Sequence, residues 1–265
     1  MVRTLIGIIS VLAIFASLGA LGWYFVKDRV RPKPEYLLST DKISVPDAPP
    51  WVPERFVEDV LQGSGLNRTG SLLDKTLPQK LTEAFAAHPW VERVEQVIPR
   101  YPSGAEVKLS YRAPVALVEI PKRSVFLVDR NGVVLPPDYL SDTTTDRRSE
   151  FLTIQGIQSM PLGSVGTPWG DPMVQTAAQL AAALKDTAGQ LSLARIISVT
   201  EATPSGTRIV CRLRTAAGME IHWGTFSPND PKMEAKIKKL RDLHEQFRSL
   251  DNIPAAFRPI DLSRE

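Results

Sequence analysis

The feature that most constrains this chain is a run near its start that holds no charged residue. It extends from Leu5 to Val26, where 17 of the 22 residues are apolar and the other five are Gly or Ser. As a helix it would be about 33 Å long, which is enough for a hydrocarbon core of about 30 Å. The run therefore predicts a single transmembrane helix at residues 5–26, after a short tail at residues 1–4.

A cleaved signal peptide is the alternative interpretation of this run. The run is longer than the usual apolar region of such peptides, about 7–15 residues, and an aromatic pair at its far end is typical of a membrane interface. We therefore expect an anchor that is not removed. Its membrane-anchoring side chains are Leu5, Ile6, Ile8, Ile9, Val11, Leu12, Ile14, Phe15, Leu18, Leu21, Trp23, Tyr24, Phe25 and Val26.

The residues that follow the run are basic and rich in proline. Residues 27–35 are predicted to be a short, stiff linker. Four basic residues follow the run, Lys27, Arg29, Arg31 and Lys33, whereas only one, Arg3, precedes it. Counted alone, these charges would leave the large C-terminal part in the cytoplasm. Long domains are translocated largely regardless of charge, so the count does not decide the topology.

Composition excludes several classes of function. The chain has 32 basic and 29 acidic residues, a net charge of +3, which is too small for a dedicated nucleic-acid-binding protein. Its one cysteine, Cys211, excludes an internal disulfide and any metal site with several cysteines. Three histidines leave little material for a His-rich metal centre. We expect no cofactor.

Residues 36–113 predict a small α+β domain. Alternating apolar residues suggest strands at Tyr36–Val45, Val91–Ile98 and Glu106–Tyr111. Apolar residues at helical spacing suggest helices at Pro53–Leu61 and Leu77–Ala87. The order strand, helix, helix, strand, strand predicts a small sheet with both helices on one face.

Residues 114–265 predict a second, β-rich domain with two helices, so that the overall fold class is α+β. Pro114 cannot donate a ladder hydrogen bond, and Arg112-Ala113-Pro114 is the predicted hinge between the domains. The helices are expected at Met173–Leu184 and Pro231–Leu250. The strands are expected at Val115–Ile120, Val125–Val128, Val133–Leu135, Phe151–Ile154, Leu193–Val199, Thr207–Leu213, Met219–Trp223 and Phe257–Leu262.

The sequence holds no motif that carries chemistry by itself. It lacks a phosphate-binding glycine loop, a zinc-protease helix motif and a nucleophile elbow. Cys211 alternates with Arg212 and Arg214, so it is expected to face the interior, and His222 is expected to be structural. The basic run Lys232–Arg241 is expected to be a solvated helix face.

Several short motifs, taken in order, resemble the FtsQ/DivIB family of bacterial cell-division proteins. They lie at Phe85–Val94, Val107–Ala116, Leu127–Leu135, Phe151–Gly156 and Pro259–Leu262. Each is a strand end or a turn and is weak alone, but together they cover the chain in order.

This resemblance implies a single-pass protein of the inner, or cytoplasmic, membrane, with its large C-terminal part outside the cytoplasm at the division site. Residues 36–113 would be a POTRA-like domain, and residues 114–265 the β-rich domain of the family. It also implies a scaffold without catalytic activity, cofactor, nucleic acid or small-molecule substrate. The implied partners are bitopic division proteins of FtsB and FtsL type, with membrane lipid contacted through the anchor.

Two alternatives come from other classes of protein. One is a POTRA-containing envelope protein of an outer-membrane assembly or secretion type, although such proteins carry tandem POTRA units and a C-terminal barrel. The other is a membrane-anchored enzyme whose site is assembled from distant residues, which a conserved polar pocket would favour.

The last predicted strand is the candidate partner site. The resemblance implies that a partner adds a strand there, because an edge strand is a template for main-chain pairing. An alternative is that Ile260 and Leu262 only pin the chain to the core. The candidate residues are Phe257, Arg258, Ile260, Asp261, Leu262 and Ser263.

Overall fold

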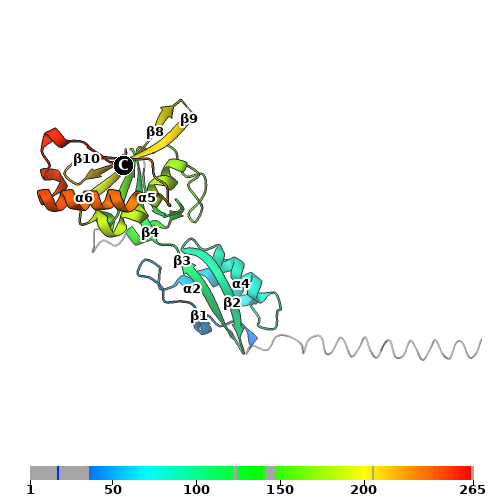
Figure 1. The fold of residues 1–265 in the computed structure, drawn as a ribbon. Coiled ribbons are helices and arrows are strands. Elements are labelled where there is room, and N and C mark those ends of the chain that lie inside the picture. The colour runs from blue at the N-terminus through cyan, green and yellow to red at the C-terminus, as the bar shows by residue number, and fades with distance from the viewer. Residues whose placement is uncertain (1–16, 18–35, 122–123, 141–146, 205, 264–265) are drawn as a thin grey trace, which may run out of the picture. The chain divides into compact units, whose positions relative to one another are not determined.

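The computed structural model describes residues 17, 36–121, 124–140, 147–204 and 206–263. They form two compact units that alternate along the chain (Figure 1). The first unit comprises the described residues up to Pro46 together with Arg55–Phe85 and Val94–Lys108. The second comprises Asp47–Glu54, Ala86–Arg93 and the described residues from Leu109 onward.

A three-stranded sheet and two longer helices build the first unit. The sheet has the order β1-β3-β2, with β1 parallel to β3. In chain order the elements are η2 (Thr40–Lys42), β1 (Ile43–Ser44), α2 (Phe56–Ser64), α3 (Leu66–Thr69), α4 (Leu77–Ala86), β2 (Val91–Arg100) and β3 (Gly104–Tyr111). The helical spacing of Leu77, Leu81 and Phe85 buries all three. The Phe85 ring lies 5.7 Å from that of Phe56 on α2.

An eight-stranded sheet with the order β11-β10-β9-β8-β7-β4-β5-β6 builds the second unit. The parallel pairs are β4–β7, β7–β8 and β10–β11. The strands are β4 (Pro114–Ile120), β5 (Ser124–Asp129), β6 (Val134–Leu135), β7 (Leu152–Gln155), β8 (Leu193–Thr203), β9 (Gly206–Thr215), β10 (Glu220–Gly224) and β11 (Ile260–Asp261). The helices are α5 (Pro172–Ala188), α6 (Met233–Phe247) and the short 3-10 turns η3 (Pro137–Leu140), η4 (Arg147–Glu150), η5 (Leu250–Asn252) and η6 (Ala255–Phe257).

Both helices of the second unit contribute to one hydrophobic core with the sheet. Helix α5 begins after Asp171, whose carboxylate accepts the Met173 N–H at 2.8 Å, and Pro172 occupies the first turn. Trp169 and Trp223 are fully buried in the core. Along β8–β10, buried residues alternate with half-exposed ones, so this part of the sheet turns its other face to solvent.

The predicted transmembrane helix at residues 5–26 is corrected. Among the described residues, no helix is long and apolar enough to cross a membrane. The longest of these helices, α5, has 17 residues. It spans about 26 Å, short of a hydrocarbon core of about 30 Å. Of the predicted span only Ser17 is described, and all the anchor side chains named above lie outside the described residues. The described fold is mixed α+β.

Two predicted strands are much shorter in the structure. The first, Tyr36–Val45, is reduced to β1, because its first part forms an isolated bridge from Leu37 to Ser71 and then a 3-10 turn. The last, Phe257–Leu262, is reduced to β11, because Ala255–Phe257 also forms a 3-10 turn. Pro259 has no N–H for a ladder, which delays the start of the strand.

The predicted domain limits at residues 36–113 and 114–265 stay a prediction. The two sheets share no strand, since β3 ends at Tyr111 and β4 begins at Pro114. The boundary between the compact units, however, falls within these strands. Val94–Lys108 belongs to the first unit, whereas the start of β2 up to Arg93 and the end of β3 from Leu109 belong to the second.

Candidate functional site

Strand β11 is the last strand at one edge of the eight-stranded sheet. It pairs with β10 in parallel, with Ile221 opposite Ile260 and His222 opposite Asp261. The Leu262 N–H donates to the His222 carbonyl at 2.8 Å. Ile260 and Leu262 are buried in the core. The strand therefore packs into the core and also forms the edge of the sheet.

The register decides which main-chain groups of β11 point away from β10. Successive residues of a strand direct their N–H and C=O groups to opposite sides. Because Leu262 donates toward β10, Ile260 also faces β10, and the N–H and C=O of Asp261 point outward. The next outward group is the Ser263 N–H, which donates to the Asp261 carboxylate at 2.9 Å. An incoming strand would meet Asp261 first.

The opposite edge of the sheet, β6, is covered by the chain itself. The Gly166 N–H donates to the Val134 carbonyl at 2.7 Å, and the Val134 N–H donates to the Thr167 carbonyl at 3.0 Å. Val133 also forms an isolated bridge with Pro168. An edge whose polar groups are satisfied by a neighbouring loop offers no template for another strand. Strand β11, at the other edge, pairs with β10 on one side.

An apolar groove of about 320 Å³ lies beside β11, on the side of helix α6. It is lined by Leu243 and Phe247 from α6 and by Ile253, Phe257 and Ile260 from the segment that leads into β11. The Phe257 side chain is 68% exposed. Apolar side chains of a strand that paired with β11 would have this groove within reach.

Arg258 fixes the segment that carries Phe257. Its Nε donates to the Ile253 carbonyl at 2.7 Å, and its guanidinium also donates to the Asp251 carbonyl. These hydrogen bonds from Arg258 thus link the end of the 3-10 turn η6 to η5. Arg258 positions the groove wall, which is a role that the sequence alone did not indicate.

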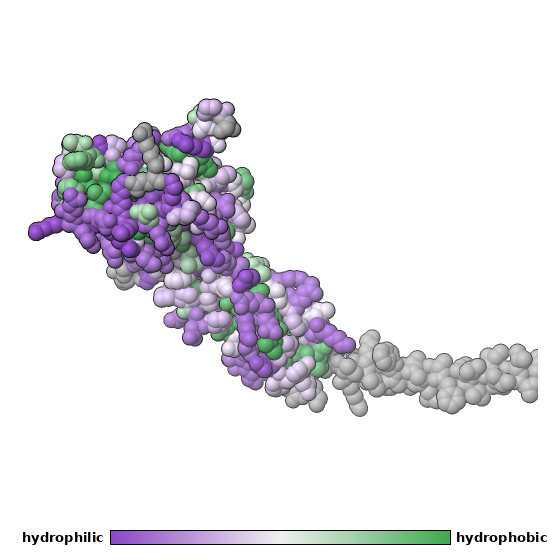
Figure 2. Space-filling model, viewed as in Figure 1, coloured by the Kyte–Doolittle hydropathy of each residue, from purple (hydrophilic) through white to green (hydrophobic). Residues whose placement is uncertain are grey.

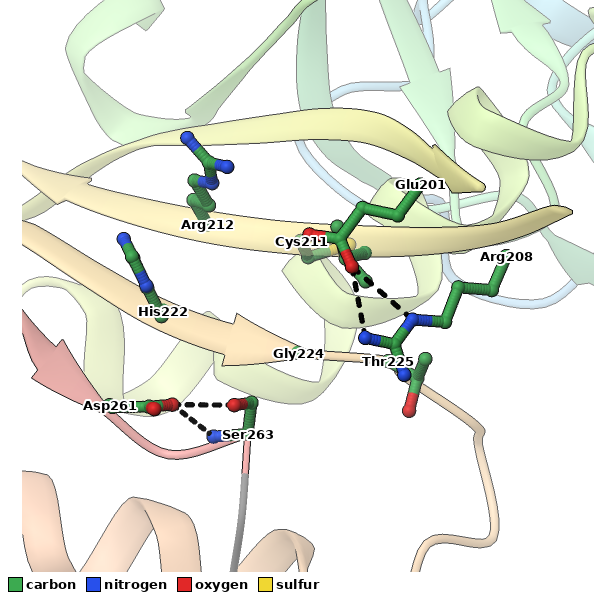
Figure 3. A pocket seen from close by; sticks show the side chains of 10 residues that line it. Glu201, Arg208, Cys211, Arg212, His222, Gly224, Thr225, Asp261 and Ser263 are labelled. Carbon is green, nitrogen blue, oxygen red and sulfur yellow. Dashed lines mark hydrogen bonds and ion pairs between the residues drawn. The ribbon is translucent and has the colours of Figure 1, made fainter. Parts of the chain in front are cut away.

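The solvent-facing side of β9–β11 carries a row of charged side chains. The strand register places Arg212, His222 and Asp261 next to one another across three strands. Figure 3 shows Arg212 and His222 projecting side by side, with Asp261 on the neighbouring strand and Ser263 just beyond its end. They line a polar depression of about 440 Å³, together with Glu201 and Arg208 at the far end of β8 and β9.

This face has more basic than acidic groups. Arg208 pairs with Glu201 at 2.9 Å, and Arg214 pairs with Glu220. Arg195 lies opposite Arg214 in the sheet, which adds a further cation. The hydrogen bond from Arg214 lowers the pKa of Glu220, and the charges of Arg212 and His222 lower it further. The face is therefore suited to acidic side chains.

Cys211 faces away from this row, as the sequence predicted. It is fully buried, and burial raises the pKa of its thiol to about 11 although a hydrogen bond with Ser198 opposes the shift. A thiol with this pKa is protonated at neutral pH and is a poor nucleophile. Across the described ranges, no group of three or more His, Cys, Asp or Glu side chains could hold a metal ion.

The structure places the candidate residues of the sequence analysis in and beside β11, and it brings residues of α6, β9 and β10 next to them. Sequence reasoning missed the groove wall from α6 and the row formed by Arg212 and His222. The alternation of Arg212 and Arg214 with buried residues was the available signal. It indicated a solvent-facing side but not which strands would lie beside it.

Comparisons with known proteins do not assign this chain to a family. No protein-family model matches the sequence. No curated protein matches it either. The resemblance to the FtsQ/DivIB family therefore stays a prediction that depends on the motifs quoted above.

Proposed function

We propose that this protein is a non-catalytic cell-division scaffold of the FtsQ/DivIB type. It acts outside the cytoplasm at the division site and holds bitopic division proteins of FtsB and FtsL type. We also propose that it contacts the lipid of the cytoplasmic membrane. The observation that carries it is the geometry of β11, an edge strand with an apolar groove on one side and a basic sheet face on the other.

The geometry of β11 defines the chemistry of the partner segment. The side chains of an added strand alternate between the two faces of the sheet. Those on the side of Ile260 would reach the groove beside α6, and those on the side of Asp261 would lie near the row of His222 and Arg212. The partner strand is therefore one that alternates apolar and acidic residues, with main-chain hydrogen bonds supplying affinity.

A proline at Asp261 tests the strand-pairing step. Asp261→Pro removes the N–H that points away from β10, and with it the hydrogen bond that this N–H would donate to the partner strand. The loss of that bond, together with the bulk of the proline ring, should weaken binding of the partner by about tenfold or more. Ile260 is unsuitable for this test, since its N–H faces β10 and belongs to the fold. Binding of the extracytoplasmic segments of FtsB- and FtsL-like proteins from the same cell is measured with the full chain.

Asp261→Ala is the matched control, because it removes the same carboxylate and keeps the N–H. It should retain most of the affinity, and both variants should unfold at nearly the same temperature as the parent protein. Binding should also weaken as salt is added, since the basic face contributes. Wild-type affinity in a folded Asp261→Pro variant would contradict the proposed mode of binding.

A further inference from the structure

Two arginines lie directly opposite each other in the interior of the eight-stranded sheet. Arg195 on β8 is the cross-strand partner of Arg214 on β9. Like charges that face each other across an antiparallel pair of strands destabilise a sheet. A feature that costs stability without an evident gain within the fold is typical of a functional site. We call Arg195, Arg212 and Arg214, which share the solvent-facing side of β8 and β9, the arginine face.

A β-bulge turns Arg195 to the solvent-facing side of β8. Leu193 pairs with Thr215, and both side chains are buried. In a regular strand Arg195, two residues further on, would point to the same side as Leu193. The register shifts between these two residues, so that Arg195 lies opposite Arg214 and not opposite Leu213. The opposed arginines therefore result from a specific irregularity of β8.

The arginine face carries positive charge that its neighbours do not neutralise. Within the described part of the chain, neither Arg195 nor Arg212 forms an ion pair or a side-chain hydrogen bond. Arg214 pairs with Glu220, but its Nε is buried and has no hydrogen-bond partner among the described residues. His222 lies opposite Arg212 and adds charge whenever it is protonated. The face is therefore suited to bind carboxylates.

The spacing of the arginine face matches that of an extended peptide. Arg212 and Arg214 are two residues apart on β9, so their Cα atoms are about 7 Å apart, and Arg195 lies on the adjacent strand. An extended peptide with an acidic residue at every second position repeats its carboxylates at the same interval of about 7 Å. A guanidinium can donate two parallel hydrogen bonds to each carboxylate. A single small anion would fill only one of these positions, so the spacing favours an acidic peptide.

The arginine face is distinct from the β11 edge and from the apolar groove. Strands β9 and β10 lie between β8 and β11. A strand added to β11 would therefore lie about 19 Å from β8, too far for its side chains to pair with Arg195. The groove lies on the side of α6, and Figure 2 shows apolar surface where the segment after α6 lies. A ligand of the arginine face must therefore be a separate segment of chain.

We infer that the arginine face binds an extended acidic segment of a partner protein, whose alternate carboxylates lie between Arg195, Arg212 and Arg214. Bound carboxylates would offset the repulsion between the two opposed arginines. The site uses side chains of β8 and β9 and no main-chain group of β11. This inference and the proposed function can therefore fail separately.

A synthetic peptide that alternates Glu and Thr tests the inference. The peptide carries a fluorophore, and its binding to the full chain is followed by fluorescence anisotropy. The parent protein should bind it, and Arg195→Gln and Arg212→Gln should each weaken binding by about tenfold. Lys108→Gln is the matched control, because it removes one exposed cation from β3 and should leave the affinity unchanged. A peptide with Gln in place of every Glu should not bind.

Thermal unfolding of the same variants separates a binding role of Arg195 from a structural one. Arg195→Gln removes the repulsion with Arg214, so without peptide it should unfold at the same temperature as the parent protein or slightly above it. If Arg195 only supported the fold, the unfolding temperature of this variant would fall. Such a fall would contradict the inference.

Two further measurements compare the acidic peptide with other ligands and with the β11 edge. Asp261→Pro should bind the peptide as the parent protein does, because β11 takes no part in this site. Inorganic phosphate and phosphatidylglycerol vesicles should compete only weakly with the peptide. Parental affinity in both Arg195→Gln and Arg212→Gln, or displacement of the peptide by the vesicles or by phosphate at equal charge concentration, would overturn the inference.

Discussion

Asp129 organises the turn between β5 and β6 in the second unit, and its replacement by alanine should be among the most damaging single changes there. The side chain is 2% exposed. One carboxylate oxygen accepts the Asn131 and Val133 N–H groups at 2.8 and 2.9 Å. The other accepts a hydrogen bond from Arg112 at 2.7 Å.

The expected loss of stability follows from the groups that Asp129→Ala leaves without a partner. The Val133 N–H is buried, and an unsatisfied buried N–H costs about 1–3 kcal/mol. Arg112, only 16% exposed, loses its carboxylate, and a hydrogen bond to a charged group contributes about 1.5–3 kcal/mol. Together these give about 2.5–6 kcal/mol. Breaking a buried ion pair by removing one partner costs about 3–5 kcal/mol, which lies within that range and is the loss we expect. In a unit of this size that corresponds to a fall in Tm of about 6–20 °C.

Thermal unfolding followed by the fluorescence of the buried tryptophans Trp90, Trp169 and Trp223 measures this loss. Glu92→Ala is the control, because it removes the exposed ion pair between Glu92 and Arg130 in the same region. Exposed pairs contribute about 0–1 kcal/mol, so the control should unfold close to the parent temperature. Equal and small shifts of the unfolding temperature for both variants would refute the reasoning, because the buried ion pair would then contribute no more to stability than the exposed one.

Two further predictions concern the core of the second unit. Gly156 has φ +90°, and a Cβ there would clash with the Ser198 carbonyl oxygen, so Gly156→Ala should cost about 2 kcal/mol or more in urea unfolding. Gly189→Ala, where nothing lies within 4 Å, is the control and should be nearly neutral. Burial raises the pKa of Cys211 from 9.0 to about 11. Between those pH values the unfolded thiol ionises and the folded one does not, so stability should fall as pH rises, by about 1.4 kcal/mol per unit relative to Cys211→Ala. Parallel pH curves for the two proteins would contradict this.

Much of the secondary structure could be predicted from the sequence, because helical and strand periodicities are local properties. The spacing of Leu77, Leu81 and Phe85 indicated α4, and the alternation of Val107 and Leu109 with polar residues indicated β3. Both elements lie within a few residues of their predicted bounds. Periodicity was less useful where other hydrogen bonds compete, as in the shortened first and last strands.

Burial of charged side chains was not predictable in the same way. The basic run on α6 was expected to be a solvated face, and this is wrong for Lys236, which is 3% exposed. Its ammonium donates to the Trp223 carbonyl at 3.1 Å and lies 3.8 Å from the Asp230 carboxylate. The long side chain extends to β10, and its ammonium can be buried only because that strand lies close enough to accept its hydrogen bond.

The sequence by itself determined that the chain contains a mixed α+β fold, and that its final residues are candidates for a sheet edge. Its local patterns could not determine the strand order, because β10 and β11 pair across more than 30 residues of intervening chain. That pairing makes β11 an edge and directs the Asp261 N–H outward. It also places Asp261 beside His222, although the two residues lie 39 positions apart in the chain. Non-local pairing is thus the physical reason that tertiary structure, and not sequence, decided the candidate site.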